Sequence, residues 1–156
     1  MLIDNHEEGM RAALAEAQKA FDEGEVPVGA AIVRDGMIVG RGHNQMEGLL
    51  DSTAHAEILA IGAAATTLET WRLTDCTIYV TLEPCIMCAG ALVQSRIGLL
   101  VYGAHDPKAG ACGSRIDILG EPWLNHQVPL VSGVMAQESA GALSAFFEAK
   151  RQAEGK

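Results

Sequence analysis

The sequence contains few aromatic residues and no long hydrophobic run. Phe, Trp and Tyr make up 4% of the residues, so a core must be built mainly from Ala, Val, Ile, Leu and Met. No apolar run approaches the ~20 residues of a membrane-spanning helix, which argues against a membrane partner. The first ten residues lack the basic start and the apolar stretch of a signal peptide. We therefore expect a cytoplasmic protein.

Cysteine and positive charge are also scarce. The 4 cysteines are too few for a disulfide scaffold, so a close cysteine pair favours metal or redox chemistry. There are 11 Lys and Arg residues against 20 Asp and Glu residues, which gives a formal net charge of −9. Proteins that bind nucleic acid mainly through its phosphates usually carry a basic excess. Either the partner is not a large polyanion, or a local basic patch binds it within an acidic background.

The order of apolar segments predicts a single α/β domain over residues 1–156. Apolar residues recur at helical spacing from Met10 to Phe21, and Gly24 ends this first helix. Residues 28–42 predict a hairpin that turns at Asp35 and Gly36. Helices and strands then alternate, which favours a three-layer α/β/α architecture with a mixed five-stranded central sheet flanked by helices. The remaining expected elements are helices at 52–69, 85–96 and 140–152, strands at 75–83, 97–104 and 128–134, and a Gly-rich loop at 105–114.

A cysteine pair, Cys85 and Cys88, follows a Glu-Pro where an extended segment gives way to a helical one. Alone, this spacing fits a redox pair, half of a structural metal site, or part of a catalytic metal site. His55 lies at the start of the second expected helix, which Ser52 or Thr53 can cap. Neighbouring strand ends bring the following helix starts together in such sheets, so one His and two Cys could hold one ion. Three protein ligands would leave the fourth position of a zinc ion open, as in catalytic sites.

Glu57 stands two residues after His55. On a helix this offset points Glu57 away from the histidine, so we do not expect it to be a metal ligand. It can approach from the open side of the ion, where water would bind. Zinc lowers the pKa of such a water from ~15.7 toward ~7, and a nearby carboxylate can carry the proton to a substrate. The arrangement suits hydrolytic attack on an electrophilic carbon.

The segments HAE (55–57) and PCIMC (84–88) together match the H-x-E…P-C-x-x-C signature of zinc nucleobase deaminases. Longer segments resemble the bacterial tRNA-specific adenosine deaminases of the cytidine/deoxycytidylate deaminase superfamily, in family order and over nearly the whole chain. The resemblance implies a cytidine-deaminase-like fold, a homodimer, and conversion of adenosine to inosine at the wobble position of an arginine tRNA anticodon. The matching segments are EVPVGAAIV, STAHAEILAI, TIYVTLEPCIMCAGALVQSRIGLLVYGA, DPKAGACGS, LNHQV and LSAFFEAKRQ.

The same resemblance assigns roles to individual residues. It implies that His55, Cys85 and Cys88 bind one zinc ion per chain and that Glu57 is the catalytic proton shuttle. Asn44 matches the residue that hydrogen-bonds the flipped base. The other matching substrate-binding positions are Val28 and Ala56 in the base pocket, Asp106 and Lys108 in a loop that meets the tRNA anticodon stem-loop, and Phe147 near the flanking nucleotides.

Three positions depart from the family pattern, and each removes positive charge. Gln45 replaces an arginine that commonly follows the asparagine, and Glu148 stands where a basic residue is typical. His105 precedes the loop aspartate, where many members have Arg or Lys. Because each lost phosphate contact weakens RNA binding, a deaminase of a free nucleobase or nucleoside such as guanine is the main alternative. A non-catalytic zinc-binding protein is a further alternative, against which Glu57 argues.

Overall fold

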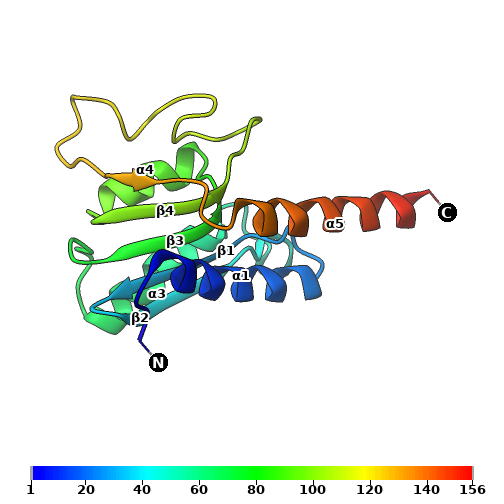
Figure 1. Cartoon of the computed structure of the whole chain (residues 1–156), viewed down its shortest axis with the longest axis horizontal. Helices are drawn as coiled ribbons and strands as arrows, with labels where there is room; N and C mark the ends of the chain where they lie inside the picture. Colours follow the sequence, from blue (N-terminus) through cyan, green and yellow to red (C-terminus); the bar gives the residue numbers. More distant parts are fainter. Residues whose placement is uncertain (1, 156) are drawn as a thin grey trace.

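The computed structural model describes residues 2–155 and confirms an α/β architecture, with a mixed sheet between helices (Figure 1). The elements are α1 (His6–Asp22), β1 (Gly29–Arg34), β2 (Met37–His43), α2 (Met46–Leu49), α3 (Ala56–Leu68), β3 (Thr77–Leu82), α4 (Ile86–Gln94), β4 (Leu99–Ala104), β5 (Leu130–Val131) and α5 (Ala136–Glu154). The five strands lie in the order β2-β1-β3-β4-β5.

Every strand except β1 runs in the same direction. β2 and β3 are each antiparallel to β1, so they are parallel to one another, and β4 and β5 continue parallel to β3. The ends of β2, β3 and β4 therefore lie at the same edge of the sheet as the beginning of β1. We call this the shared edge, and the segments that leave it begin close together.

The hairpin between β1 and β2 turns where the sequence predicts. Asp35 and Gly36 both have positive φ, 51° and 76°. This pair of left-handed residues matches the right-handed twist of the flanking strands, which is why Asp-Gly is favoured there. The predicted hairpin is confirmed.

Helices cover both faces of the sheet. Figure 1 shows α1 and α5 in front of the strands and α3 and α4 behind them. Side chains alternate along the strands because successive residues point to opposite faces. Ile32 and Ile78 join the core under α3 and α4, whereas Val33 and Tyr79 pack against α1. The expected three-layer arrangement is confirmed.

Gly42 in β2 lets helix α3 lie directly on the strand. A Cβ at this position would overlap the carbonyl oxygen of Ala56 and crowd the backbone nitrogen of Ala60. Ala56 is the first residue of α3 and follows His55 directly. This close packing therefore also fixes where the histidine stands relative to the sheet.

The second predicted helix begins at Ala56 rather than near Ser52. Its N-cap residue is His55, so the expectation that Ser52 or Thr53 caps it is wrong. The Oδ1 atom of Asp51 instead accepts hydrogen bonds from the backbone N–H of Thr53 at 2.8 Å and from its hydroxyl at 2.7 Å. These local bonds hold residues 51–53 in a turn that ends before the helix starts.

The sequence pattern did not predict the short helix α2, which follows β2. Its C-cap residue Leu50 adopts a left-handed conformation with φ of 52°. The last strand, β5, contains only two residues and comes after a long connection that starts at the end of β4. The four residues of α2 are too few to show a helical pattern in the sequence, whereas β5 lies within the strand predicted at 128–134.

The outer part of α5 extends beyond the rest of the molecule (Figure 1). Phe146 is buried at 5% exposure and packs edge-on against Phe21, with 5.9 Å between the ring centroids. Residues 147–155 are all exposed. Among the described residues, no helix combines the length and the apolarity that crossing a membrane requires.

The contact at Gly42 generates a stability prediction. Gly42→Ala should lower the free energy of unfolding by about 1–3 kcal/mol, because the added methyl group overlaps the backbone of α3. Gly62→Ala is the matched control, since a Cβ there meets nothing within 4 Å, and it should raise stability by up to about 1 kcal/mol. Urea unfolding followed by circular dichroism measures both. Equal stability of the two variants would contradict the close packing of α3 on β2.

Candidate functional site

The shared edge brings the sequence motifs together. His55 is the N-cap residue of α3, and Cys85 is the N-cap residue of α4. Both helices therefore begin at the edge where β2 and β3 end, and their N-termini carry partial positive charge. Cys88 lies on the first turn of α4 and is fully buried. The structure therefore confirms the prediction that one His and two Cys side chains lie close together.

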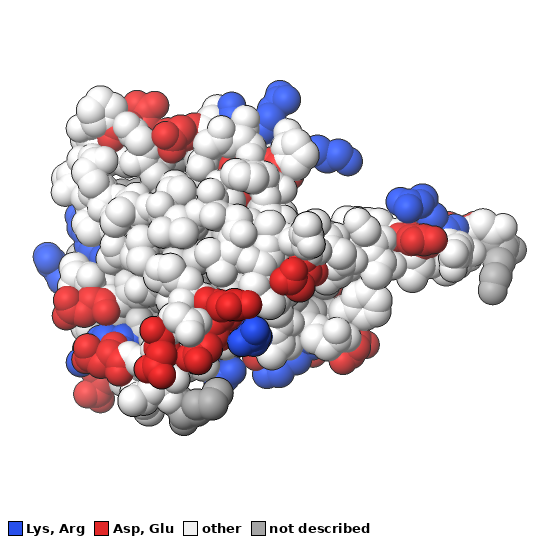
Figure 2. All heavy atoms as spheres, viewed as in Figure 1, with Lys and Arg blue, Asp and Glu red and all other residues white. Residues whose placement is uncertain are grey.

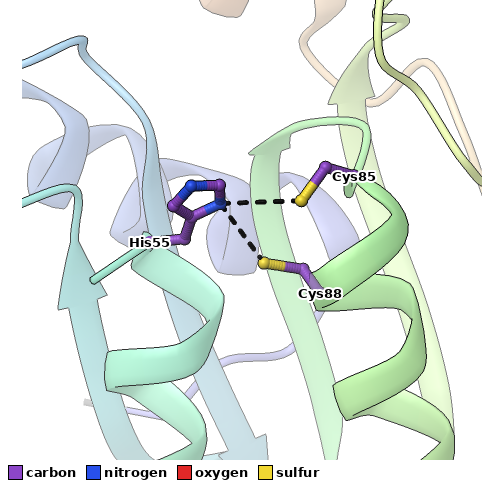
Figure 3. A group of neighbouring side chains, drawn as sticks. All are labelled: His55, Cys85 and Cys88. Carbon is purple, nitrogen blue, oxygen red and sulfur yellow. Dashed lines mark hydrogen bonds between the residues drawn. The ribbon is translucent and has the colours of Figure 1, made fainter. Parts of the chain in front are cut away.

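The three side chains present a donor set that fits a zinc ion (Figure 3). Nδ1 of His55 lies 3.6 Å from Sγ of Cys85 and 3.5 Å from Sγ of Cys88. All three donor atoms lie within 4.8 Å of one another. Tetrahedral zinc, with N and S ligands at about 2.0–2.1 and 2.3 Å, holds its N and S atoms about 3.6 Å apart. The two observed distances from Nδ1 of His55 to the sulfur atoms therefore match those of a zinc site.

The thiols of this group influence each other's ionisation. Hydrogen bonding from Cys88 and from His55 lowers the pKa of Cys85 to about 3, which favours its thiolate form. The interaction with Cys85 and the burial of the side chain raise the pKa of Cys88. A divalent cation favours two adjacent thiolates because it removes their repulsion. Two sulfur donors and one imidazole nitrogen form a soft donor set, which suits zinc better than a hard cation such as magnesium.

Glu57 is a buried carboxyl group in the same region. It is 4% exposed and lies on the first turn of α3. Burial raises its pKa to about 7, with a smaller raising effect from the negative charge of Cys85. A carboxyl group that gains and loses a proton near neutral pH suits general acid–base chemistry.

A cavity of about 220 Å³ opens beside this group. Its lining includes His55, Glu57 and Cys85, whereas the buried Cys88 is not among the lining residues. The volume is smaller than the about 300–1,000 Å³ that hold a drug-sized ligand, so it suits one small ring system. The other lining residues are Val26, Val28, Asn44, Met46, Ala56, Leu82, Glu83, Asp106 and Ala109.

Asn44 contributes the main neutral polar group of the cavity. Its side-chain nitrogen donates to the carbonyl oxygen of Val26 at 3.3 Å. Within residues 2–155, its Oδ1 atom is buried and has no hydrogen-bond partner. A buried acceptor left unpaired costs about 1–3 kcal/mol, so a ligand with an N–H donor would be stabilised there.

Most of the residues implied by the family resemblance meet at this cavity. Val28, Asn44, Ala56 and Asp106 all line it. Lys108 and Phe147 do not line it, and both are exposed at the surface. Lys108 belongs to the loop that follows β4, and Phe147 is the first residue of the exposed end of α5.

Sequence reasoning missed several lining residues. Met46 belongs to the unpredicted helix α2, and Val26, Leu82 and Ala109 are small or aliphatic residues that any core could use. Glu83 could have been recognised in the sequence, because it is an acidic residue at the end of a buried strand and directly precedes the Pro-Cys motif. An acidic residue in such a place needs partners, and the sequence does not show which ones.

Comparison with protein families gives matches over most of the chain. Residues 4–140 match the MafB19-like deaminase family. The tRNA-specific adenosine deaminase of Bacillus subtilis is 51% identical over 143 residues, which covers 92% of this chain and 89% of the relative. The tRNA-specific adenosine deaminase of Haemophilus influenzae is 48% identical over 147 residues, which covers 94% of this chain and 85% of the relative.

Solved structures share the fold. A chain from a study of A-to-I editing by tRNA:A34 deaminases at the wobble position of transfer RNA has a TM-score of 0.84 and 44% identity, covering 86% of this chain and 98% of that chain. The guanine deaminase of Bacillus subtilis has a TM-score of 0.64 and 31% identity, covering 96% of this chain and 95% of that chain. Identity and structural agreement are thus both higher with the tRNA:A34 deaminase chain.

The donor geometry generates a prediction about metal content. Protein purified with zinc should contain one ion per chain, and Cys88→Ala should lower this to near zero because two ligands hold zinc poorly. Cys112→Ala is the matched control, since Cys112 is another buried cysteine outside the donor group. Elemental analysis by mass spectrometry after dialysis measures the content. Full zinc occupancy in Cys88→Ala would contradict the assigned ligand set.

Proposed function

Since the chain belongs to the tRNA-specific adenosine deaminase family, we propose that it deaminates adenosine to inosine at the wobble position of an arginine tRNA anticodon. The net reaction replaces the 6-amino group of adenine by oxygen from water and releases ammonia. One observation carries the chemistry: a buried carboxylate and a zinc-type donor group border the same cavity.

The proposed cofactor is one zinc ion per chain, held by His55, Cys85 and Cys88. Zinc supplies a Lewis acid that makes water a nucleophile near neutral pH. The chain supplies the remaining steps through Glu57, which accepts a proton from the attacking water. Glu57 delivers this proton to N1 of the base. It then transfers a second proton, taken from the hydroxyl group now bonded to C6, to the amino group, which leaves as ammonia. Its burial, which raises its pKa to about 7, supports a role in both directions of proton transfer.

The walls of the cavity hold the base during this transfer. We propose that Asn44 pairs with the edge of the flipped adenine, because its Oδ1 atom is buried and unpaired among the described residues. Val28 and Ala56 are small and apolar and leave room for a flat ring. Extruding the wobble base costs little because the anticodon loop is already unpaired. Asp106, in the wall of the cavity, and Lys108 and Phe147 at the surface are proposed to contact the nucleotides around it.

Exposed basic residues in the loop after β4 support an RNA partner despite the net charge of −9. Figure 2 shows acidic side chains gathered near the beginning of α1, where Asp4 and Glu7 are exposed. Some of the Lys and Arg side chains lie at the edge formed by the loop after β4 and on the outer part of α5, and others lie beside the acidic group. Lys108 and Arg115 are exposed in that loop. Exposed basic side chains are therefore available on the segment that borders the cavity, although Asp106 in the same segment is acidic.

A free nucleobase such as guanine is the alternative substrate. The relationship to a guanine deaminase at 31% identity and the losses of positive charge at Gln45, His105 and Glu148 favour it. The two relatives described above, both named as tRNA-specific adenosine deaminases, are 48% and 51% identical over more than nine-tenths of the chain. The tRNA substrate is therefore the preferred proposal.

The assembly is also a proposal. We propose that residues 1–156 act as one zinc-dependent deaminase domain, that the protein is cytoplasmic, and that it works as a homodimer. The family resemblance implies the dimer. The exposed Ile86, at 63% exposure in the first turn of α4, supports it as an apolar contact beside the site.

The proton-shuttle role of Glu57 generates a kinetic prediction. Glu57→Gln should lower kcat for inosine formation by about 10²–10⁴-fold, because the amide cannot accept and return the proton. Zinc content should remain at that of the unmodified protein, since Glu57 is outside the donor group. Glu7→Gln, an exposed carboxylate on α1, is the control and should leave kcat unchanged. Normal turnover by zinc-loaded Glu57→Gln would show that another group moves the proton.

The proposed RNA substrate generates a salt prediction. The KM for an anticodon stem-loop should rise steeply with KCl, because each phosphate contact contributes about 0.7–0.9 to the slope of log K against log salt. Lys108→Ala should reduce this slope by about one unit. Lys19→Ala, on α1 and paired with Glu16, should leave it unchanged. A KM that does not respond to salt would favour the free nucleobase.

A further inference from the structure

A second buried carboxylate borders the cavity, and the chemistry described above does not use it. Glu83 follows the end of β3, and its side chain is 0% exposed. Among the described residues, no Lys or Arg forms an ion pair with it. An ionised carboxylate without such a partner needs several hydrogen bonds to remain buried. The positions of its hydrogen-bond donors therefore indicate what Glu83 does.

All of these donors belong to one segment, the loop that follows β4. Oε1 of Glu83 accepts from the backbone N–H of Asp106 at 3.0 Å and from the hydroxyl of Ser114. Oε2 accepts from the backbone N–H groups of Cys112 and Ser114, each at 3.0 Å. Nδ1 of His105 lies 3.6 Å from Oε1. Both carboxylate oxygens are therefore occupied, which leaves Glu83 unsuited to move a substrate proton.

The loop depends on this carboxylate because it has little regular structure of its own. Apart from an isolated bridge between Cys112 and Asp117, residues 105–117 belong to no helix or strand. Buried backbone N–H groups need acceptors, and Glu83 supplies them at both ends of the segment 106–114. Gly110 shows how closely the two parts fit, because a Cβ there would overlap the carboxyl group of Glu83.

The same loop is attached to the turn that carries a metal-ligand candidate. The backbone N–H of Ala111 donates to the carbonyl oxygen of Pro84 at 2.9 Å, directly before Cys85. Asp106 and Ala109 in this loop line the cavity. Glu83 thus holds one wall of the cavity at a fixed distance from the turn that carries Cys85.

We propose that Glu83 is a positioning residue that fixes the loop 105–114 against the Pro84–Cys85 turn and so sets how the loop meets the substrate. The proposal rests on the proposed function for the identity of the substrate. It assigns Glu83 to substrate binding and not to proton transfer. Loss of these hydrogen bonds should make the loop more mobile. Binding of the stem-loop would then have to order the loop, and the entropy lost in doing so would weaken binding.

Glu83→Gln is the test variant, because the amide keeps the size of the side chain but turns one acceptor into a donor that faces backbone N–H groups. KM for the stem-loop should rise by roughly ten- to 100-fold, as expected when bonds to a charged acceptor are lost. The kcat should change by less than about threefold, because Glu83 takes no part in proton transfer and its loss should leave the activation barrier nearly unchanged. Zinc content should stay at one ion per chain. Hydrogen exchange of residues 105–116 should become faster.

Glu25→Gln is the matched control. Glu25 is also a buried carboxylate, but it accepts from the backbone N–H groups of Glu47 at 3.1 Å and Gly48 at 2.7 Å in α2. Its variant should speed exchange in α2 and leave residues 105–116 protected. A Glu83→Gln/Lys108→Ala double variant completes the test: the two effects on KM should be clearly non-additive, because Glu83 acts through the loop that carries Lys108.

Unchanged loop exchange and unchanged KM in Glu83→Gln would overturn the proposal, and so would a lowered kcat at unchanged KM. If Glu83→Gln does not fold, Ser114→Ala decides, because it removes one hydrogen bond to the same carboxylate. That variant should raise KM by about two- to tenfold and speed loop exchange, and no change would overturn the proposal. If the unmodified protein forms no inosine in the stem-loop, the proposed function fails, whereas the exchange measurement still tests the Glu83–loop contact.

Discussion

The direction of a single strand determines where the functional groups lie. Because β1 alone runs against the other four strands, its beginning and the ends of β2, β3 and β4 meet at one edge of the sheet. The chain leaves this edge into α3, into α4 and into the loop after β4. Helix starts concentrate partial positive charge there, which favours a thiolate at Cys85. The donor group, the cavity and the loop are consequences of this arrangement.

The close packing of α3 on β2 fixes the position of His55 at the shared edge. Gly42 leaves no room between the strand and Ala56, so the histidine that precedes Ala56 is fixed relative to the sheet. Cys85 occupies the equivalent N-cap position of α4. Two helix starts held in this way place one nitrogen and two sulfur atoms at zinc-like separations. A site built on helix ends needs little reorganisation when a metal binds.

Much of this could be predicted from the sequence because it depends on short-range patterns. Asp35 and Gly36 specify the hairpin, and the spacing of His55, Cys85 and Cys88 specifies a metal group once the helices are placed at strand ends. The expectation that Ser52 or Thr53 caps the helix is wrong. The side chain of Asp51 accepts hydrogen bonds from the N–H and the hydroxyl of Thr53, which places both in a turn before the helix.

The contacts of Glu83 could not be predicted, because its partners lie 23 to 31 residues away in a loop without periodicity. The same holds for Met46, whose place in the cavity depends on the short helix α2. Such long-range contacts are set by tertiary packing and leave no local pattern in the sequence. The metal group and its carboxylate were therefore visible in the sequence, whereas the walls around the substrate were not.

The most direct test of the central claim compares substrates. Zinc-loaded protein would be incubated with an arginine tRNA anticodon stem-loop that carries a wobble adenosine and, separately, with free adenosine, cytosine and guanine. Nucleoside analysis by mass spectrometry would measure inosine in the RNA, and ammonia release would report on the free compounds. We predict inosine at the wobble position and no turnover of the free compounds. Guanine deamination with an unmodified stem-loop would contradict the tRNA assignment.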